Sequence, residues 1–266
     1  MTVNTVTDSN SSTAQSACSS GSAGCTLRAA ITVANANPGS TINLPKLSSD
    51  YLLTVTGTGE ALNATGDLNI RADVTIVGSG GPTISAGATR ASAIDSIITM
   101  PSFYGDNVNG AIVSISGVTF AHGKNPNPGG QGTNKGGCVR FDTQVYGKVT
   151  LTNVTVTDCI APDGSGGGIA IISSGIAPPN SGGHTPVITM KNITVSQSES
   201  DYATDTQPSA EGGGMFLGIY ISIALDGSTF RQNLAYAPIA TKPNSSPPVE
   251  VGADGGAISI QAQTGI

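Results

Sequence analysis

Acidic side chains are the residues of this chain best suited to chemistry, because carboxyl groups transfer protons, bind cations and assist the cleavage of polysaccharides. Most of the acids are scattered, but Asp158, Asp163 and Glu211 lie beside glycine-rich turns that recur along the sequence, and Arg140 lies on a neighbouring strand. If these turns stack on one edge of the fold, the four side chains could form a catalytic site or bind calcium. The alternative, which we favour, is that they are solvated acids at turns.

The other chemically active residue types occur outside any recognised motif. His122 and His184 each stand alone in a turn or a glycine-rich loop, and we interpret both as ordinary polar residues. No serine lies in a Gly-x-Ser-x-Gly motif of the kind that positions a catalytic nucleophile. The sequence also contains neither a phosphate-binding loop nor a calcium-binding repeat. We therefore expect no catalytic residue, no metal site and no cofactor, with calcium as the alternative.

The four cysteines, Cys18, Cys25, Cys138 and Cys159, are predicted to form two disulfides. None belongs to a Cys-x-x-Cys pair, and the chain has only 2 histidines, which disfavours a structural zinc site. Cys18 and Cys25 close a short loop before a predicted helix, and Cys138 and Cys159 begin and end one repeat unit, so we predict these two pairings. Disulfides persist in oxidising compartments, which indicates an extracellular protein.

Composition and charge restrict the class of protein further. The 266 residues include 11% charged residues, 36 glycines and no tryptophan, and the formal net charge is −6. This composition argues against a disordered chain, a helical bundle and a coiled coil. A basic stripe for nucleic acid and an apolar run for a membrane span are both absent from the sequence. The first residues form no signal peptide, as we expect of a mature secreted or surface protein.

An internal repeat predicts the elements that would position these residues. Four six-residue segments align without gaps and share an apolar first and last residue: Ile115–Phe120, Leu151–Val156, Met190–Val195 and Leu225–Phe230. The third residue is always Gly or Asn, which tolerate left-handed backbone, so we predict a structural ladder of turns at Gly117, Asn153, Asn192 and Gly227. Constant strands joined by spacers of variable length are typical of a solenoid.

The predicted fold is all-β, a right-handed parallel β-helix with a short N-terminal capping helix. We expect one continuous domain, with a cap over residues 1–45 and β-helix coils over residues 46–266. The first and last positions of the repeat should form two interior columns: Ile115, Leu151, Met190 and Leu225, and Phe120, Val156, Val195 and Phe230. The segment that should follow Gly255–Ile260 is missing, so the last coil is expected to be incomplete and to pair with another chain.

A single helix is predicted over residues 26–37, where apolar residues recur with helical spacing behind Thr26 as the N-cap. It would cover the exposed strand edges at one end of the solenoid. Before it, we predict a short strand over residues 2–7 and a polar loop over residues 8–24. Arg28 is expected to tie the helix to the first coil through hydrogen bonds rather than to bind a ligand.

The N-terminal residues resemble a known family. Cys25-Thr-Leu-Arg-Ala-Ala-Ile31, Ala34-Asn35 and Ile42-Asn-Leu-Pro45 are similar to the CSLREA-type domain of bacterial surface proteins. The later coils resemble the β-helices of polymorphic outer-membrane proteins and autotransporter passengers. This chain has Ala29 where the family has a glutamate after the arginine, so that partner of Arg28 is lost. The resemblance implies a secreted or surface-attached repeat protein and does not imply a catalytic site.

Three functions remain open. We favour a non-catalytic extracellular surface or structural protein, similar to an adhesin or stalk, whose partner is a host or cell-surface glycan or protein. The first alternative is a filament subunit that stacks end to end with other copies of itself. The second is a polysaccharide lyase or hydrolase on the same scaffold. A groove that combines acids with a facing Arg or Lys would favour the enzyme, whereas a flat face of Thr, Ser and Asn would favour the adhesin.

Overall fold

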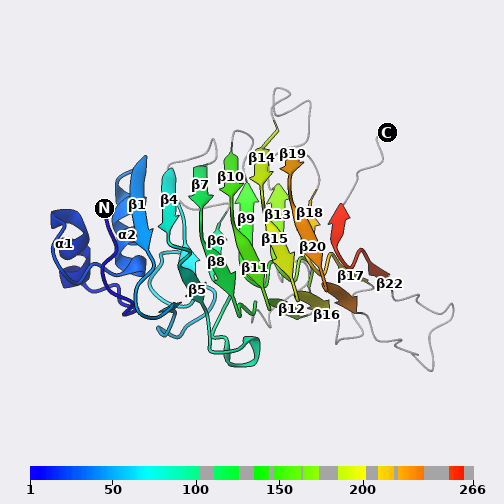
Figure 1. The fold of residues 1–266 in the computed structure, drawn as a ribbon, viewed down its shortest axis with the longest axis horizontal. Coiled ribbons are helices and arrows are strands. Elements are labelled where there is room, and N and C mark those ends of the chain that lie inside the picture. The colour runs from blue at the N-terminus through cyan, green and yellow to red at the C-terminus, as the bar shows by residue number, and fades with distance from the viewer. Residues whose placement is uncertain are drawn as a thin grey trace.

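Short apolar and β-branched runs between glycine-rich turns form the strands of this protein, and stacking of those strands builds the fold. The computed structural model describes residues 1–101, 111–125, 135–143, 147–162, 164–173, 185–201, 209–218, 221–236 and 252–260. Over these residues the chain is a parallel β-solenoid that begins with two short helices, and these helices lie at the opposite end of the solenoid from its last described strands (Figure 1). The predictions of an all-β parallel solenoid and of an N-terminal helical cap are confirmed.

Three sheets of six strands run along the described solenoid, and two smaller sheets lie beside them. Sheet A contains β1 (Ser40–Pro45), β4 (Val74–Ser79), β7 (Ile112–Ser116), β10 (Lys148–Thr152), β14 (Val187–Lys191) and β19 (Ser222–Asp226). Sheet B contains β2 (Tyr51–Leu52), β5 (Thr83–Ser85), β8 (Thr119–Ala121), β11 (Thr155–Thr157), β15 (Thr194–Ser196) and β20 (Thr229–Arg231).

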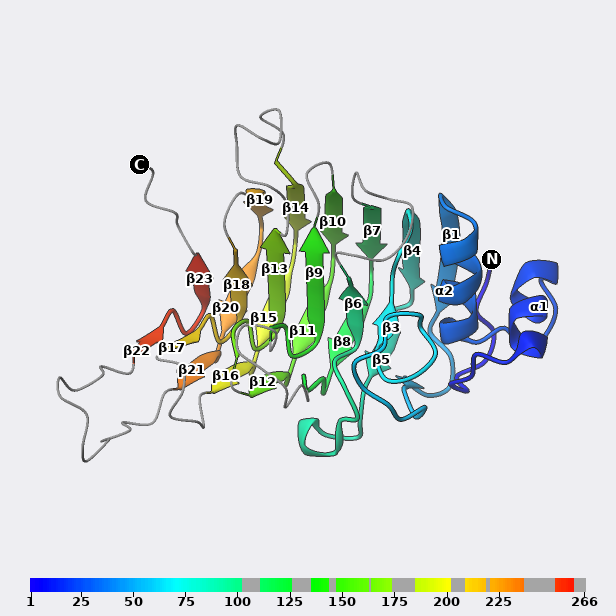
Figure 2. The same ribbon diagram turned by 180° about the vertical axis from the view of Figure 1, so that it is seen from behind.

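Sheet C lies on the side of the solenoid that faces the viewer in Figure 2. It contains β3 (Leu68–Asn69), β6 (Ile98–Met100), β9 (Val139–Thr143), β13 (Ile169–Ser173), β18 (Met215–Leu217) and β23 (Ile258–Ile260). The smaller sheets pair β12 (Ile160–Pro162), β16 (Glu199–Asp201) and β21 (Leu234–Tyr236), and β17 (Ser209–Glu211) with β22 (Gly252–Asp254). Each sheet thus brings together residues that lie one coil apart in the sequence.

The interior of the solenoid is filled by columns of apolar side chains. In sheet A, Leu151 pairs with Ile115 on one side and with Met190 on the other, and all three are fully buried. The column in sheet B has the same arrangement, with Phe120, Val156 and Val195 in register and fully buried. Because side chains alternate between the two faces of a strand, this register directs every second residue outward.

The last members of the two columns differ from the prediction. Leu225 pairs with Met190 as expected, but its side chain is 41% exposed, and Phe230 is half-buried. Strands β19 and β20 are the outermost described strands of their sheets. The prediction that Leu225 is interior is therefore wrong for the described chain, because a column is buried only where a coil lies on both sides of it.

Residues with left-handed backbone form the corner between sheets A and B. Gly117, Asn153, Asn192 and Gly227 have φ angles of 67°, 52°, 54° and 58°. The side-chain Nδ2 of Asn192 donates a hydrogen bond to Oδ1 of Asn153 at 3.0 Å. This corner has the geometry predicted for the structural ladder, and the amides add hydrogen bonds between coils.

A second left-handed corner follows sheet B and was not predicted. Its members each lie five residues after a member of the first corner and have φ angles between 53° and 59°: His122, Asp158, Gln197 and Gln232. Non-glycine residues rarely adopt this conformation, and polar side chains tolerate it best. The corner therefore explains why His122 and Asp158 occupy equivalent places in successive coils.

The N-terminal cap contains one helix more than predicted. Helix α1 (Ser12–Ser20) lies where a polar loop over residues 8–24 was expected, so that prediction is wrong over these positions. The Ser11 side chain accepts a hydrogen bond from the N–H of Ala14 at its start, and Gly21 ends the helix with a φ of 74°. Its serine-rich sequence has a weak apolar face, and burial of small residues against the second helix compensates for that weakness.

Helix α2 (Leu27–Ala36) agrees with the helix predicted over residues 26–37. Thr26 is its N-cap and accepts a hydrogen bond from the N–H of Ala29. The strand predicted over residues 2–7 is not formed, because only Thr2 makes an isolated parallel bridge there, to Asn43 of β1. The cap thus covers the first edge of sheet A with one bridge and with helices rather than with a full strand.

Both predicted disulfides are present in the structure. Cys18 of α1 bonds to Cys25 just before α2, with 4.5 Å between their Cα atoms, and so joins the two helices. Cys138 bonds to Cys159 with 5.5 Å between their Cα atoms and closes one coil. Within the described ranges, no helix has the length and apolar character needed to cross a membrane.

Several sequence-based predictions lie outside the described residues. They concern Asp163, His184 and the C-terminal residues 261–266. Pairing of an incomplete last coil with another chain therefore stays a prediction.

Candidate functional site

The structure places the predicted acids against different partners. Asp158, at the second left-handed corner, lies 3.6 Å from Nε of Arg90 and 3.6 Å from Nε2 of His122. Arg90, in the short 3₁₀ helix Arg90–Ser92, also lies 2.9 Å from Glu199. All four side chains are partly exposed. We call these four residues the corner network.

Arg140 and Glu211 lie on the sheet C side. Arg140 makes a two-bond ion pair with Asp142, from Nε to Oδ1 at 3.0 Å and from Nη2 to Oδ2 at 2.7 Å. Glu211 lies 3.5 Å from the hydroxyl of Ser165. Burial lowers the pKa of Lys135, which lies near both Glu211 and Arg140. Two members of the predicted group are thus on one side of the solenoid, whereas Asp158 belongs to the corner network.

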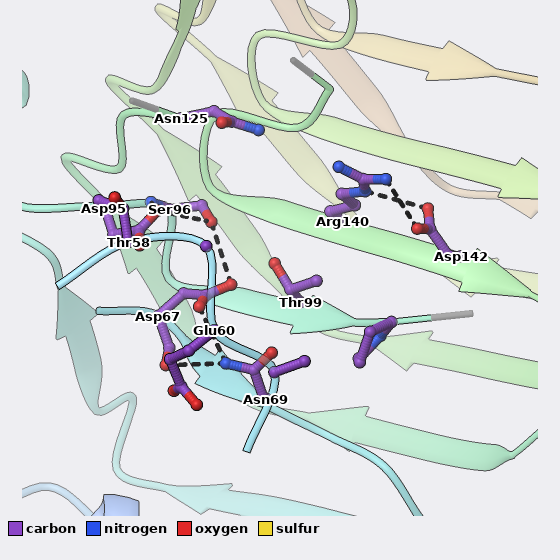
Figure 3. Close-up of a pocket in the computed structure, with 13 residues that line it drawn as sticks. Thr58, Glu60, Asp67, Asn69, Asp95, Ser96, Thr99, Asn125, Arg140 and Asp142 are labelled. Carbon is purple, nitrogen blue, oxygen red and sulfur yellow. Dashed lines mark hydrogen bonds and ion pairs between the residues drawn. The ribbon is translucent and has the colours of Figure 1, made fainter. Parts of the chain in front are cut away.

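A pocket of about 220 Å³ lies on the outer face of sheet C, over β3, β6 and β9 (Figure 3). Its floor is the outward row formed by Asn69, Thr99 and Arg140, which are direct neighbours in register. The inward neighbours of these residues are fully buried. The alternation of the strands therefore presents polar side chains to the pocket and apolar side chains to the core.

Two buried acids, Asp67 and Asp95, line one side of this pocket (Figure 3). Asp67 comes directly before β3, and its carboxylate accepts hydrogen bonds from Asn69 Nδ2 at 2.9 Å and from the side chain of Thr99. Asp95 comes shortly before β6, and its Oδ1 accepts a hydrogen bond from the N–H of Ser96 at 2.7 Å. The main-chain N–H of Asp67 also donates to the Asp95 carboxylate. The two carboxyl groups are therefore close neighbours, which we call the aspartate pair.

The hydroxyl of Ser96 lies between the two carboxyl groups. Its oxygen is 3.4 Å from Oδ2 of Asp67 and 3.5 Å from Oδ1 of Asp95. A hydroxyl has a single proton to donate, so it can donate to only one of the two carboxylates at a time. The other contact becomes a hydrogen bond when its carboxyl group is protonated and donates to the serine oxygen.

Burial raises the pKa of both members of the aspartate pair. For Asp67 the burial effect exceeds the opposing effect of the hydrogen bonds from Thr99 and Asn69. For Asp95, burial and the nearby negative charge of Asp67 raise the pKa to about 7. Removal of water destabilises the ionised form of a carboxyl group, and a second negative charge adds to that effect. The pair consequently holds a proton under near-neutral conditions.

The N-terminal cap fixes the position of Asp67. Arg28 of α2 is 1% exposed and donates hydrogen bonds to the main-chain oxygens of Gly66, at 2.6 Å, and Asp67, at 3.1 Å. Its guanidinium also binds both carboxylate oxygens of Asp8, at 2.7 and 3.1 Å. Arg28 therefore makes the contacts expected of it, and Asp8 supplies the acidic partner that Ala29 cannot provide.

The segment around Glu60 forms another wall of the pocket. The Glu60 carboxylate accepts hydrogen bonds from the main-chain N–H groups of Leu62, Ala64 and Thr65, at 2.6 to 3.0 Å. Gly66, with a φ of 61°, packs so tightly that a Cβ atom would collide with the Asp95 carboxylate. The acid and the glycine hold this segment in a defined shape beside the aspartate pair.

The corner near His122 contains the residue types of a Ser-His-Asp triad but not its hydrogen bonds. Ser85 Oγ lies 3.3 Å from Nδ1 of His122, whose Nε2 lies 3.6 Å from Asp158. The Ser85 hydroxyl donates to the carbonyl oxygen of Gly87, and Nδ1 of His122 lies 3.2 Å from the same oxygen. A carbonyl only accepts, so its bond with Nδ1 requires a proton on that nitrogen, which then cannot accept one from serine. This geometry does not activate Ser85 as a nucleophile.

The aspartate pair was not predicted from the sequence. Its signal was weak, because the only common feature of Asp67 and Asp95 is that each precedes an apolar run of sheet C by a few residues. A search for acids that recur just before strands of one sheet could have found them. Among the described members of the predicted group at the glycine-rich turns, Arg140 alone lines the pocket.

Carboxyl, amide, hydroxyl and guanidinium groups together give the pocket many hydrogen-bond donors and acceptors. Over the described residues, no group of three or more His, Cys, Asp or Glu side chains is arranged to hold a metal ion. Comparisons of this chain with family models, with curated proteins and with solved structures found no match. The functional argument therefore depends on the fold and on the geometry of the pocket.

Proposed function

We propose that this protein is an extracellular surface β-solenoid, similar to an adhesin, that binds a cell-surface carbohydrate in the pocket on sheet C. The observation that carries this proposal is the pocket itself, where polar side chains from three successive coils converge over β3, β6 and β9. Such convergence of a few fixed polar groups in a concave site is the usual mark of a ligand-binding site.

The chemistry of the pocket suits a sugar. Each sugar hydroxyl both donates and accepts hydrogen bonds, and the pocket is lined by carboxylate acceptors at Asp67 and Asp95 and by the guanidinium donors of Arg140. Its volume of about 220 Å³ lies below the roughly 300–1,000 Å³ of sites for drug-sized molecules. We infer that it holds one sugar unit of a longer glycan.

Two observations support an extracellular location. The disulfides Cys18–Cys25 and Cys138–Cys159 are compatible with an oxidising compartment. The resemblance of residues 25–45 to bacterial surface proteins favours the same location.

Polysaccharide cleavage is the second candidate, because the pocket combines acids with Arg140 on its far side (Figure 3). Its hydrogen bonds favour binding instead. Glycosidases place two carboxyl groups on either side of the bond to be cleaved, whereas Asp67 and Asp95 contact the same Ser96 hydroxyl. Arg140 is already bound through two hydrogen bonds to Asp142.

A glycan array followed by titration calorimetry tests the proposal. Thr99→Tyr should fill the pocket and reduce affinity for the glycans identified by at least tenfold, because Thr99 lies in the middle of the floor. Thr189→Tyr, at an outward and exposed position of sheet A, is the matched control and should leave affinity unchanged. Failure to bind any glycan, or equal binding by both variants, would contradict the proposal. Release of new reducing ends from a bound glycan would favour the enzyme.

A further inference from the structure

We propose that the sugar bound in this pocket carries a protonated amine, as an amino sugar does, and that its ammonium group binds between Asp67 and Asp95. The inference depends on the proposed carbohydrate-binding function and specifies the class of ligand. It starts from the distribution of charge in the pocket.

The other charges that line the pocket already have partners. Arg140 and Asp142 bind each other, and the Glu60 carboxylate accepts three main-chain hydrogen bonds. The aspartate pair differs, because no Lys or Arg side chain in the described part of the chain forms an ion pair with either carboxyl group. The pocket therefore contains two adjacent acids that have hydrogen bonds but no ion-pair partner among the described residues, and the charge of Arg28 acts on Asp67 without forming an ion pair with it.

An ammonium group matches what the aspartate pair lacks. It supplies one positive charge and three hydrogen-bond donors, and each carboxylate has lone pairs beyond those used by Asn69, Thr99 and Ser96. Hydrogen bonds between charged groups are shorter and stronger than neutral ones. The hydroxyl groups of the same sugar would then contact the uncharged part of the floor.

Other ligands fit the pocket less well. A divalent cation needs several oxygen ligands, and the described residues hold no cluster suited to one. A uronic acid would place a third carboxylate beside the aspartate pair and would be repelled. A lysine side chain has the same ammonium group but lacks the hydroxyl groups for Asn69 and Thr99, so we assign the pocket to an amino sugar.

The charged state of the pair gives a pH dependence with a definite sign. The charged groups around the pair are Glu60, Arg28 of α2, and Arg140 and Asp142 of β9. Burial and the Asp67 charge raise the pKa of Asp95 to about 7, so the empty pocket holds a proton that an ammonium group must displace. Affinity for the amine should therefore rise between about pH 5 and pH 7. It should fall above about pH 8, where an amine of the α-amino type loses its proton.

Calorimetry with matched oligosaccharides tests the inference. A glucosamine tetramer should bind the intact protein at pH 7 at least tenfold more tightly than the N-acetylglucosamine tetramer, which has the same backbone without the charge. Binding heats measured in two buffers of different ionisation enthalpy should show release of a proton. Nα-acetyl-lysine amide should bind more weakly than glucosamine, and stronger binding of the lysine derivative would overturn the choice of an amino sugar.

Asp95→Asn should reduce affinity for the glucosamine tetramer by about tenfold and abolish proton release. Asp50→Asn, which changes an exposed acid outside the pocket, is the control and should have no effect. If the acetylated tetramer binds as tightly as the free amine, the inference fails while the proposed function stands. If neither tetramer binds and no other glycan binds, the proposed function fails as well. If Asp95→Asn does not fold, the unmodified protein still tests the inference: release of a proton on binding of the glucosamine tetramer supports it, and binding without proton release contradicts it.

Discussion

The aspartate pair and the corner network are two groups of acids on the outside of the same solenoid, and they differ in burial and in counter-charge. Asp67 and Asp95 are 8% and 6% exposed and have no ion-pair partner among the described residues. Asp158 and Glu199 are partly exposed and share Arg90. Acids that are buried without a counter-charge destabilise a fold, so their presence points to a ligand, whereas an exposed and paired group needs no such explanation.

The same comparison explains why the glycine-rich turns were a poor guide to the site. Acids at turns are solvated and usually find an arginine or lysine nearby, as Asp158 does. The aspartate pair is made by stacking, since Asp67 and Asp95 come from successive coils and lie beneath the segment held by Glu60. Four experiments test this contrast, beginning with the one of largest expected effect.

Both regions depend on the predicted register, which Leu151→Asp would destroy. Leu151 is fully buried in sheet A, and an unpaired charge there costs several kcal/mol, so the variant should not fold. Thr155→Asp, at a half-buried outward position of sheet B, should lower the free energy of unfolding by roughly 1 kcal/mol. Urea unfolding followed by circular dichroism measures both changes, and equal effects would mean that the register is wrong.

Arginines at the two regions should differ in their contribution to stability. Arg28→Met leaves the buried Asp8 carboxylate without its cation and should cost about 3–5 kcal/mol. Arg90→Met removes the partly exposed ion pairs with Glu199 and Asp158 in the corner network and should cost roughly 0–1 kcal/mol. Thermal unfolding of the two variants compares them directly. A similar small loss from both would show that the cap does not fix the position of Asp67.

The aspartate pair should make stability depend on pH. Asp95 has a raised pKa of about 7 in the folded state, so the folded protein binds a proton more tightly than the unfolded chain. The contribution of Asp95 to stability is therefore fully present below about pH 4 and is lost as the pH rises through 7, by roughly 4 kcal/mol in total. Asp95→Asn should remove this loss, which unfolding curves measured from pH 4 to pH 8 would reveal. A slope unchanged by the substitution would contradict the assignment of the proton to the pair.

The smallest effect is expected at the first left-handed corner, away from both regions. Asn192 has a φ of 54°, which glycine adopts without strain and valine does not. Asn192→Gly should change stability by less than about 1 kcal/mol, and Asn192→Val should cost roughly 1–3 kcal/mol. Chemical denaturation separates the two substitutions. Equal stability of the two variants would show that the corner does not require left-handed backbone.

Much of the scaffold was predictable because its signals are local and repeated. The Gly or Asn at the third position of each segment marks the first corner, and the apolar first and last positions mark the columns that contain Leu151 and Val156. The helical spacing and N-cap of residues 26–37 likewise predict α2. Helix α1 escaped prediction because its stability comes from packing against α2 and from the disulfide of Cys18 rather than from its own apolar pattern.

The sequence by itself thus determined the kind of fold, the first corner, the capping helix α2 and the pairing of the cysteines, because each depends on residues close together or on a repeated pattern. Only the tertiary structure decided which acids meet. Asp67 and Asp95 are brought together by the stacking of two coils and by the anchoring of Gly66 and Asp67 to Arg28. The lengths of the segments between strands vary from coil to coil, so no fixed sequence spacing marks neighbours across the stack, and burial of the two carboxyl groups exists only once the coils have packed.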